Sequence, residues 1–397
     1  MVGGLLALFM GGCGAKTGLL VPEQDASVDA ESDAPLCIEV PEGETETEVE
    51  IDVSTQLLSA DVFFLIDCTG SMRGEITNIQ RGLAGTIVPG AVAAIPDVRF
   101  GVGAFADFPL HDYGAPGDLP FALRRAITDD IGAVQTAIDG LPWWDGDDLP
   151  ESHTEALYQV ATGEGLGNWV DPAPGCPQPG LGYPCFREGS QPVVVLITDA
   201  PFHNGPRGVN GYVAVSPTPH TFDQAIDALQ ALEIRVIGIS SAPDGVDHLR
   251  EVARETGAVD GDGVPLVYSI ESNGTGLDES VVEGIESLAR RVPLDVDAVV
   301  ADVGGDDLDA TILVQEVRAL RADPPDGVDR IEGNTFYNAL PGTVLTFSLV
   351  VRIDVIPVPE HTTLYPVLVR VRGNRISILK EQIVYIEVPG LDGEDLC

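Results

Sequence analysis

"SADVFFLIDCTGSMRGEI", residues Ser59–Ile76, gives the clearest indication of the fold class. Its apolar run ends abruptly at Asp67, and two hydroxyls follow at alternate positions, Thr69 and Ser71. A run that is apolar at successive positions is typical of a strand buried on both faces of a parallel sheet. Ligands of such sheets gather at the carboxyl ends of the strands, which is where Asp67 is expected to lie.

Strand-like and helix-like segments alternate from about Ala60 to Arg291. The strand-like runs after the first are "VRFGVGAF", "FALRRAI", "PVVVLIT" and "EIRVIGIS". The helix-like segments are "ITNIQRGLAGTIV", "DDIGAVQTAIDGL", "TEALYQVA", "TFDQAIDALQAL", "DHLREVARET" and "ESVVEGIESLARRV". This alternation predicts an α/β domain over residues 58–292, with a doubly wound, mainly parallel sheet.

The helical period fades after Pro293, where runs such as "TVLTFSLVVRIDVI" and "TLYPVLVRVRG" have strand character. They predict a β-sandwich domain over residues 293–397. Residues 37–57 have the same character, and we expect their strands to join this sandwich, so that the α/β domain is inserted between its two parts. The alternative is a strand that packs on the α/β domain itself.

The charge balance limits the possible partners. The chain has 397 residues, and its formal net charge of −42 repels phosphate backbones, which argues against nucleic-acid binding. The acidic excess fits a protein exposed to salt or divalent cations outside the cell, or it serves solubility alone.

The N-terminal residues predict export. The apolar segment Val2–Met10 is too short to span a bilayer and is typical of a signal peptide, and "MGGC" resembles a bacterial lipobox. Residues 1–13 are therefore expected to be a signal peptide with lipidation at Cys13, and residues 14–36 an acidic, flexible linker. This predicts a chain that is lipid-anchored to the cell envelope, at the outer membrane or cell surface. The alternative is an incidental cysteine.

An exported chain can oxidise its remaining cysteines. Cys176 and Cys185 bracket the Pro- and Gly-rich loop "CPQPGLGYPC", which a disulfide could close, and Cys37 with Cys397 is a second possible pair. Cys68 would then be left as a packed small residue.

Further acids follow other strand-like runs and precede one helix. Asp107 and Asp199 lie at strand ends, and Asp148 and Glu151 lie in the loop "WWDGDDLPESH". The chain has no lysine between Lys16 and Lys380 to pair these acids, so a cation among them would relieve their repulsion. One carboxylate with two hydroxyls suits Mg²⁺ or Mn²⁺. For the first loop alone, the alternative is that Thr69 or Ser71 caps the following helix.

These stretches, in this order, resemble a known family. "DCTGSM" is similar to the D-x-[ST]-x-S signature of the metal-ion-dependent adhesion site of von Willebrand factor type A domains. "DCTGSMRGEITNIQRGL", "VRFGVGAFADFP", "DLPESHTEALYQVATGEGLGNW" and "LITDAPFH" resemble the inserted domain of integrin β subunits. The integrin domain is also inserted in a β-sandwich, which is an analogy of architecture.

The resemblance implies a set of metal ligands and a mode of binding. An acidic group of a protein partner would complete the coordination of the primary cation, and a second site would hold Ca²⁺, although Gly146 stands where the family has an asparagine ligand. Glu75 is the counterpart of a third-site acid, but Gly74 replaces its neighbour. The implied ligands are Asp67, Thr69, Ser71, Glu151 and Asp199 at the primary site, and Asp107, Asp148 and Glu151 at the second.

Three functions remain open from the sequence. The first is an adhesin-like binding protein, and the second is a metal-holding scaffold of the envelope. The third is a hydrolase that uses Asp67 as an aspartyl-phosphate nucleophile, but such enzymes need a lysine in the site. We therefore expect a protein that is not an enzyme. His153 and His203 beside the crevice either contact a ligand or face solvent in loops.

Overall fold

The computed structural model describes residues 36–305, 308–391 and 396–397. The predicted signal peptide, the lipidation site at Cys13 and nearly all of the predicted linker lie outside these residues. No helix in the described part of the chain is long and apolar enough to cross a membrane.

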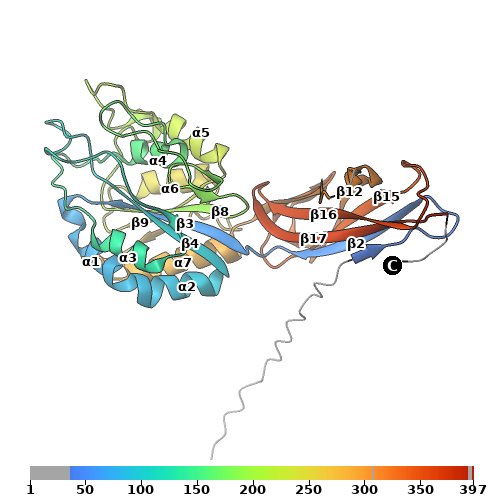
Figure 1. Cartoon of the computed structure of the whole chain (residues 1–397). Helices are drawn as coiled ribbons and strands as arrows, with labels where there is room; N and C mark the ends of the chain where they lie inside the picture. The colour runs from blue at the N-terminus through green and yellow to red at the C-terminus, as the bar shows by residue number, and fades with distance from the viewer. Residues whose placement is uncertain (1–35, 306–307, 392–395) are drawn as a thin grey trace, which may run out of the picture. The chain divides into compact units, whose positions relative to one another are not determined.

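A six-stranded sheet forms the centre of the α/β domain (Figure 1). Its strands are parallel except for the edge strand β5. In sheet order they are β10 (Val267–Ser269), β9 (Arg235–Ser240), β8 (Gln191–Thr198), β3 (Ser59–Asp67), β4 (Asp97–Phe105) and β5 (Ala122–Thr128).

Helices cover both faces of this sheet, which explains the unbroken apolar run of β3 (Figure 1). Phe64 and Ile66 pack into one core with α1, α2, α3 and α7, whereas Phe63 and Leu65 pack into a second core with α4, α5 and α6. The helices are α1 (Arg73–Gly82), α2 (Val88–Ala94), α3 (Ile131–Asp139), α4 (His153–Thr162), α5 (Phe222–Ala231), α6 (Val246–Glu255) and α7 (Leu277–Arg291).

The first helical segment extends further than the sequence predicts. We expected one helix ending near Val88, but α1 runs into a π-helical turn, η2 (Leu83–Ile87), which leads directly into α2. Pro89, which has no backbone N–H to donate, lies directly after this π-helical turn, in the first turn of α2.

Two further sheets share a third apolar core, formed by residues such as Val53, Val296 and Phe347. One sheet has the order β1-β17-β16-β11-β14-β13 and the other β12-β15-β2, and their pairs are antiparallel apart from β1 with β17. The strands are β1 (Leu36–Ile38), β2 (Glu46–Ser54), β11 (Leu294–Asp302), β12 (Val314–Asp323), β13 (Arg330–Glu332), β14 (Thr335–Ala339), β15 (Val344–Arg352), β16 (Thr363–Gly373) and β17 (Ser377–Val388).

The predicted fold class, a mainly parallel α/β sheet together with antiparallel sheets, is confirmed by this strand order. Strand β2 precedes the α/β sheet in sequence, yet it pairs along its whole length with β15, from Ser54 opposite Val344 to Glu46 opposite Arg352. A small hairpin, β6 (Gly180–Leu181) with β7 (Phe186–Arg187), precedes β8.

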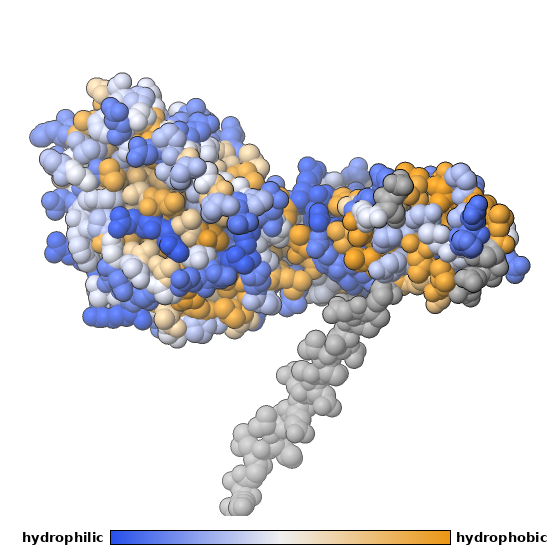
Figure 2. Space-filling model, viewed as in Figure 1, coloured by the Kyte–Doolittle hydropathy of each residue, from blue (hydrophilic) through white to orange (hydrophobic). Residues whose placement is uncertain are grey.

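Both suggested disulfides are present, Cys37–Cys397 and Cys176–Cys185, with Cα separations of 5.7 and 5.5 Å. Cys68 is free and buried, as expected of a packed small residue. On the face shown in Figure 2, hydrophilic residues cover much of the surface of the α/β domain, with smaller apolar patches between them.

Candidate metal site

The loop after β3 brings together the oxygen atoms of three side chains. Asp67 is the last residue of β3 and is buried. The backbone N–H and the hydroxyl of Thr69 both donate to Asp67 Oδ1, at 3.0 and 2.7 Å. The exposed Ser71 places its hydroxyl 3.3 Å from that of Thr69. The three residues of the signature therefore lie side by side.

Neither hydroxyl caps a helix, so the capping alternative is wrong. A 3-10 turn, η1 (Gly70–Met72), separates Thr69 from α1, and neither Thr69 nor the N-cap residue of α1, Met72, makes a side-chain capping bond. The Thr69 hydroxyl donates instead to Asp67, and the Ser71 hydroxyl donates to Asp199 Oδ1 at 3.1 Å.

Asp199 reaches this loop because β8, which ends at the preceding residue, pairs in parallel with β3. The Thr198 hydroxyl donates to Asp67 Oδ2 at 2.8 Å. Burial, followed by the charge of Asp199, raises the pKa of Asp67 to about 7, and burial raises the pKa of Asp199. Two carboxylates at close quarters would both be stabilised in their charged form by a cation.

Glu151 lies in a strongly perturbed environment. Its backbone is fixed beside Phe202 by a parallel bridge, and its buried Oε2 has no hydrogen-bond partner. Burial raises the pKa of Glu151 to about 12, and nearby negative charges add to the shift. Those charges belong to Asp67, Asp107, Asp148 and Asp118. A buried, unpaired carboxyl among four acids is an environment that a bound cation would stabilise.

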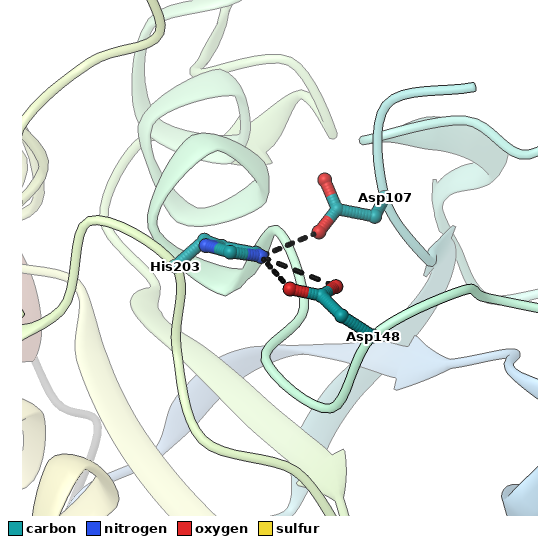
Figure 3. A group of neighbouring side chains, drawn as sticks. All are labelled: Asp107, Asp148 and His203. Atoms are coloured by element: carbon teal, nitrogen blue, oxygen red, sulfur yellow. Dashed lines mark hydrogen bonds and ion pairs between the residues drawn. The ribbon is translucent and has the colours of Figure 1, made fainter. Parts of the chain in front are cut away.

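A second group of ligand atoms lies beside Glu151 (Figure 3). Asp107 follows β4, Asp148 comes from the loop before α4, and His203 comes from the loop after β8. One ligand atom from each lies within 4.8 Å of the other two. Among the described residues this is the one group of three His, Cys, Asp or Glu side chains that meets this spacing, and the imidazole of His203 was absent from the predicted second site.

Glu75, the predicted acid of a third site, lies in the first turn of α1 and is buried. Its Oε2 has no hydrogen-bond partner. Burial raises the pKa of Glu75, a hydrogen bond with Ser241 opposes the rise, and the charge of Asp199 adds to it. The residue therefore lies near the primary group, without a second acid beside it in the helix.

The solvent-facing alternative for the two histidines is wrong, because both are buried. His153 Nδ1 lies 3.0 Å from the carbonyl oxygen of Glu151, and its Nε2 lies 2.8 Å from the Thr198 hydroxyl. Burial lowers the pKa of His153 to about 3, so its ring is neutral. The ring connects the backbone of Glu151 to Thr198, whose hydroxyl donates to Asp67.

Sequence reasoning also missed Asp118 and Tyr212. Asp118 Oδ2 accepts hydrogen bonds from the backbone N–H groups of Ala115 and Gly146, at 2.8 and 3.0 Å, which orders the loop that carries Asp148. The Tyr212 hydroxyl donates to Asp107 Oδ1 at 2.5 Å. Neither residue lies in a recognisable motif, so only the folded chain brings them to the site.

The comparisons with known proteins found no matching family model and no matching curated protein. Among solved structures, the chain is similar to a von Willebrand factor type A protein from Catenulispora acidiphila, with 13% identity, a TM-score of 0.38, and coverage of 89% of this chain and 76% of that one. It is also similar to the pilus adhesin SpaC of Lactobacillus rhamnosus GG in its open conformation, with 10% identity and a TM-score of 0.35.

The second likeness covers 88% of this chain but only 46% of the pilus adhesin, so the chain spans less than half of that protein's length. Both TM-scores are low, and the fold class rests on the strand order and pairing of the chain itself.

Proposed function

We propose that this chain is an exported, envelope-anchored protein whose von Willebrand A-like domain binds an acidic protein ligand through a divalent cation. The cation is Mg²⁺ or Mn²⁺. A carboxylate of the ligand completes its coordination from the solvent side, where Ser71 is exposed. The residues of this chain that we propose coordinate the cation are Asp67, Thr69, Ser71, Glu151 and Asp199.

The observation that carries this proposal is the environment of Glu151. Its unpaired, buried oxygen and its pKa of about 12 describe a carboxyl whose charged form has no stabilising partner among the residues that the structure describes. The neighbouring hydroxyls and carboxylates are the hard oxygen donors that Mg²⁺ and Mn²⁺ prefer.

The surface beside the loop supports a protein ligand. Gly70 and the backbone of Trp144 lie close together, and the N–H of Trp144 donates to the carbonyl oxygen of Cys68 at 2.9 Å. The adjacent Trp143 is 48% exposed, with the guanidinium of Arg73 5.6 Å from its ring centroid. An exposed aromatic ring with a cation above it suits an acidic partner surface.

Calorimetry with Mn²⁺ tests the cation. We expect binding to the wild type and none to the double variant Asp67→Ala/Asp199→Ala. A matched double variant, Asp139→Ala/Asp227→Ala, removes the same charge from exposed helical positions and should bind as the wild type does. Equal affinity in the wild type and the Asp67/Asp199 variant would refute the proposal.

A second experiment separates adhesion from scaffolding. The chain is used to capture proteins from the envelope fraction in Mg²⁺ and again in chelator. A partner that is captured only in Mg²⁺ supports ligand binding through the cation. A partner captured equally in both would show that the metal site does not bind the partner, which favours the scaffold function.

The location in the envelope is supported by the two disulfides of the described residues, which form in oxidising compartments. The lipid anchor rests on Cys13 alone. Metabolic labelling with palmitate should mark the wild type and not Cys13→Ser, whereas equal labelling would refute the anchor at this residue.

A further inference from the structure

His203 is held in one orientation by groups that do not belong to the acidic cluster. Its Nδ1 lies 2.7 Å from the carbonyl oxygen of Asn210, and a carbonyl oxygen only accepts, so Nδ1 carries a hydrogen. The ring stacks on Tyr212 at 4.3 Å and meets the edge of Tyr113 at 5.2 Å. The side chain is only 4% exposed, so the ring cannot readily turn away.

The other ring nitrogen faces two carboxylates. Nε2 lies 3.3 Å from Asp107 Oδ2 and 3.1 Å from Asp148 Oδ2 (Figure 3). With the Nδ1 hydrogen directed at Asn210, Nε2 is left to face these two carboxylates. A proton or a metal ion must therefore lie among the three atoms.

Asp107 is oriented in the same way. Its Oδ1 accepts hydrogen bonds from the backbone N–H of Phe108 at 2.6 Å and from the hydroxyl of Tyr212 at 2.5 Å. Its Oδ2 is buried and has no hydrogen-bond partner, and it is the oxygen that faces His203. Outer partners that fix a carboxylate and the far nitrogen of an imidazole are characteristic of metal ligands.

We propose that Asp107, Asp148 and His203 form a binding site for a transition-metal ion of the zinc class, separate from the proposed Mg²⁺ or Mn²⁺ site. An imidazole nitrogen with two carboxylate oxygens is a ligand set suited to Zn²⁺, whereas Ca²⁺ is bound by oxygen alone. Four ligands bound to zinc at about 2.0 Å lie roughly 3.3 Å apart, which matches the observed spacing from Nε2.

The fourth position can be filled from solvent. The side chain of Asp148 is 33% exposed, while those of Asp107 and His203 are almost fully buried, so the ion has one open side. The resemblance to the integrin domain implied Ca²⁺ here, with Asp107, Asp148 and Glu151 as ligands. The imidazole of His203 changes the expected preference from Ca²⁺ to Zn²⁺.

The test uses Co²⁺ as a coloured substitute for Zn²⁺, with the full chain kept in excess Mg²⁺. We expect the visible spectrum of four-coordinate Co²⁺ in the wild type, and its loss on adding Zn²⁺. His203→Asn should weaken both Co²⁺ and Zn²⁺ binding by at least about 100-fold, because it removes the nitrogen ligand, and loss of an outer partner alone costs about 10- to 100-fold. Asp107→Asn, a second variant, should do the same.

The matched control is His111→Asn, which removes an exposed histidine whose Nδ1 lies 2.8 Å from Asp112. It should leave the affinity for Co²⁺ unchanged. Equal Co²⁺ affinity in the wild type and His203→Asn would overturn the proposal, as would wild type that binds Ca²⁺ but no Zn²⁺.

Zinc X-ray absorption on the wild type requires no variant to fold, and a spectrum without an imidazole ligand would also overturn the proposal. The double variant Asp67→Ala/Asp199→Ala separates the two sites. This variant should lose Mn²⁺ binding and keep Zn²⁺ binding. The zinc site and the proposed adhesion site are therefore tested independently, and either proposal can fail while the other holds.

Discussion

The two candidate cation sites of the α/β domain both lie close enough to Glu151 to raise its pKa, and they differ in what surrounds them. At the primary site, Ser71 is exposed and Asp199 half-buried, so a ligand arriving from solvent can reach a cation there. At the Asp107, Asp148 and His203 site, two of the three side chains are nearly inaccessible. The first arrangement suits a cation that grips a partner, and the second suits an ion that stays and orders the surrounding loops.

The largest effect is expected from Glu151, whose pKa responds to the charges of both sites. Glu151→Gln removes the negative charge that both cations would offset, so we expect affinity for Mn²⁺ and for Zn²⁺ to fall by about 100-fold, with little change in metal-free stability. Calorimetry with each metal checks this. Glu188→Gln, at an exposed position, is the control. Loss of only one affinity would assign Glu151 to that site alone.

A large effect is also expected from pH. The pKa of Asp67 is raised from 3.8 to about 7, and that of Glu151 from 4.5 to about 12, so the folded protein holds these protons more tightly than the unfolded chain. Their contribution to stability is full below about pH 4 and is lost as the pH rises. Metal-free protein should therefore be less stable at about pH 8 than at about pH 5, by several degrees in Tm.

Thermal melts in chelator and in Mn²⁺ measure this difference, and bound Mn²⁺ should reduce the loss because it favours the charged carboxylates. The variant Asp67→Asn/Glu151→Gln should show a flatter dependence on pH in chelator. A wild-type protein whose Tm in chelator is the same at about pH 5 and about pH 8 would contradict the raised pKa values of Asp67 and Glu151.

A moderate effect that separates the two sites is expected from Asp118. Asp118→Ala releases the backbone N–H groups of Ala115 and Gly146, which should loosen the loop that carries Asp148. Zinc affinity should fall about tenfold, and Mn²⁺ affinity less. Asp227→Ala, at an exposed helical position, is the control. A larger loss of Mn²⁺ than of Zn²⁺ affinity would show that the loop supports the primary site first.

The smallest effect is expected from Trp143→Ala. Trp143 is 48% exposed, so its loss should change the free energy of unfolding by less than about 0.5 kcal/mol and leave both metal affinities unchanged. Capture of a Mg²⁺-dependent partner should still weaken. Chemical denaturation, calorimetry and the capture assay measure the three quantities, and a changed Mn²⁺ affinity would show that the ring supports the site itself.

The sequence predicts most strands and helices of the α/β domain because their burial follows a period. In β3, Phe63 and Phe64 face opposite cores, and only a strand covered on both sides has a continuous apolar run.

The strands of the antiparallel sheets were harder to predict. Strand β12 was missed because most of its residues are exposed or half-buried, and its charged residues hide the alternation. Strand β11 was also missed, although its buried residues Leu294, Val296 and Ala298 alternate with the half-buried Asp295 and Asp297 as in a strand with one solvated face.

The same reasoning explains what was found of the sites. Asp67, Thr69 and Ser71 are neighbours in one loop, so their spacing is visible in the sequence. His203 and Tyr212 reach Asp107 only through the fold, because they lie in the loop after β8 and Asp107 follows β4. The metal preference that we propose for the second site depends on the contact between His203 and Asp107, which no local sequence pattern predicts.

The bond between Cys37 and Cys397 has a mechanical consequence. Its two cysteines are 360 residues apart along the chain. The bond joins β1, which follows the predicted acidic linker, to the residues after β17. Without it, a pull on the N-terminal side would be resisted first by the three paired residues of β1 alone. With the disulfide, a force on the N-terminal side is transmitted through a covalent bond to the residues that follow β17. The pairing of β1 with β17 can then break without the N-terminal strands being pulled out one after another.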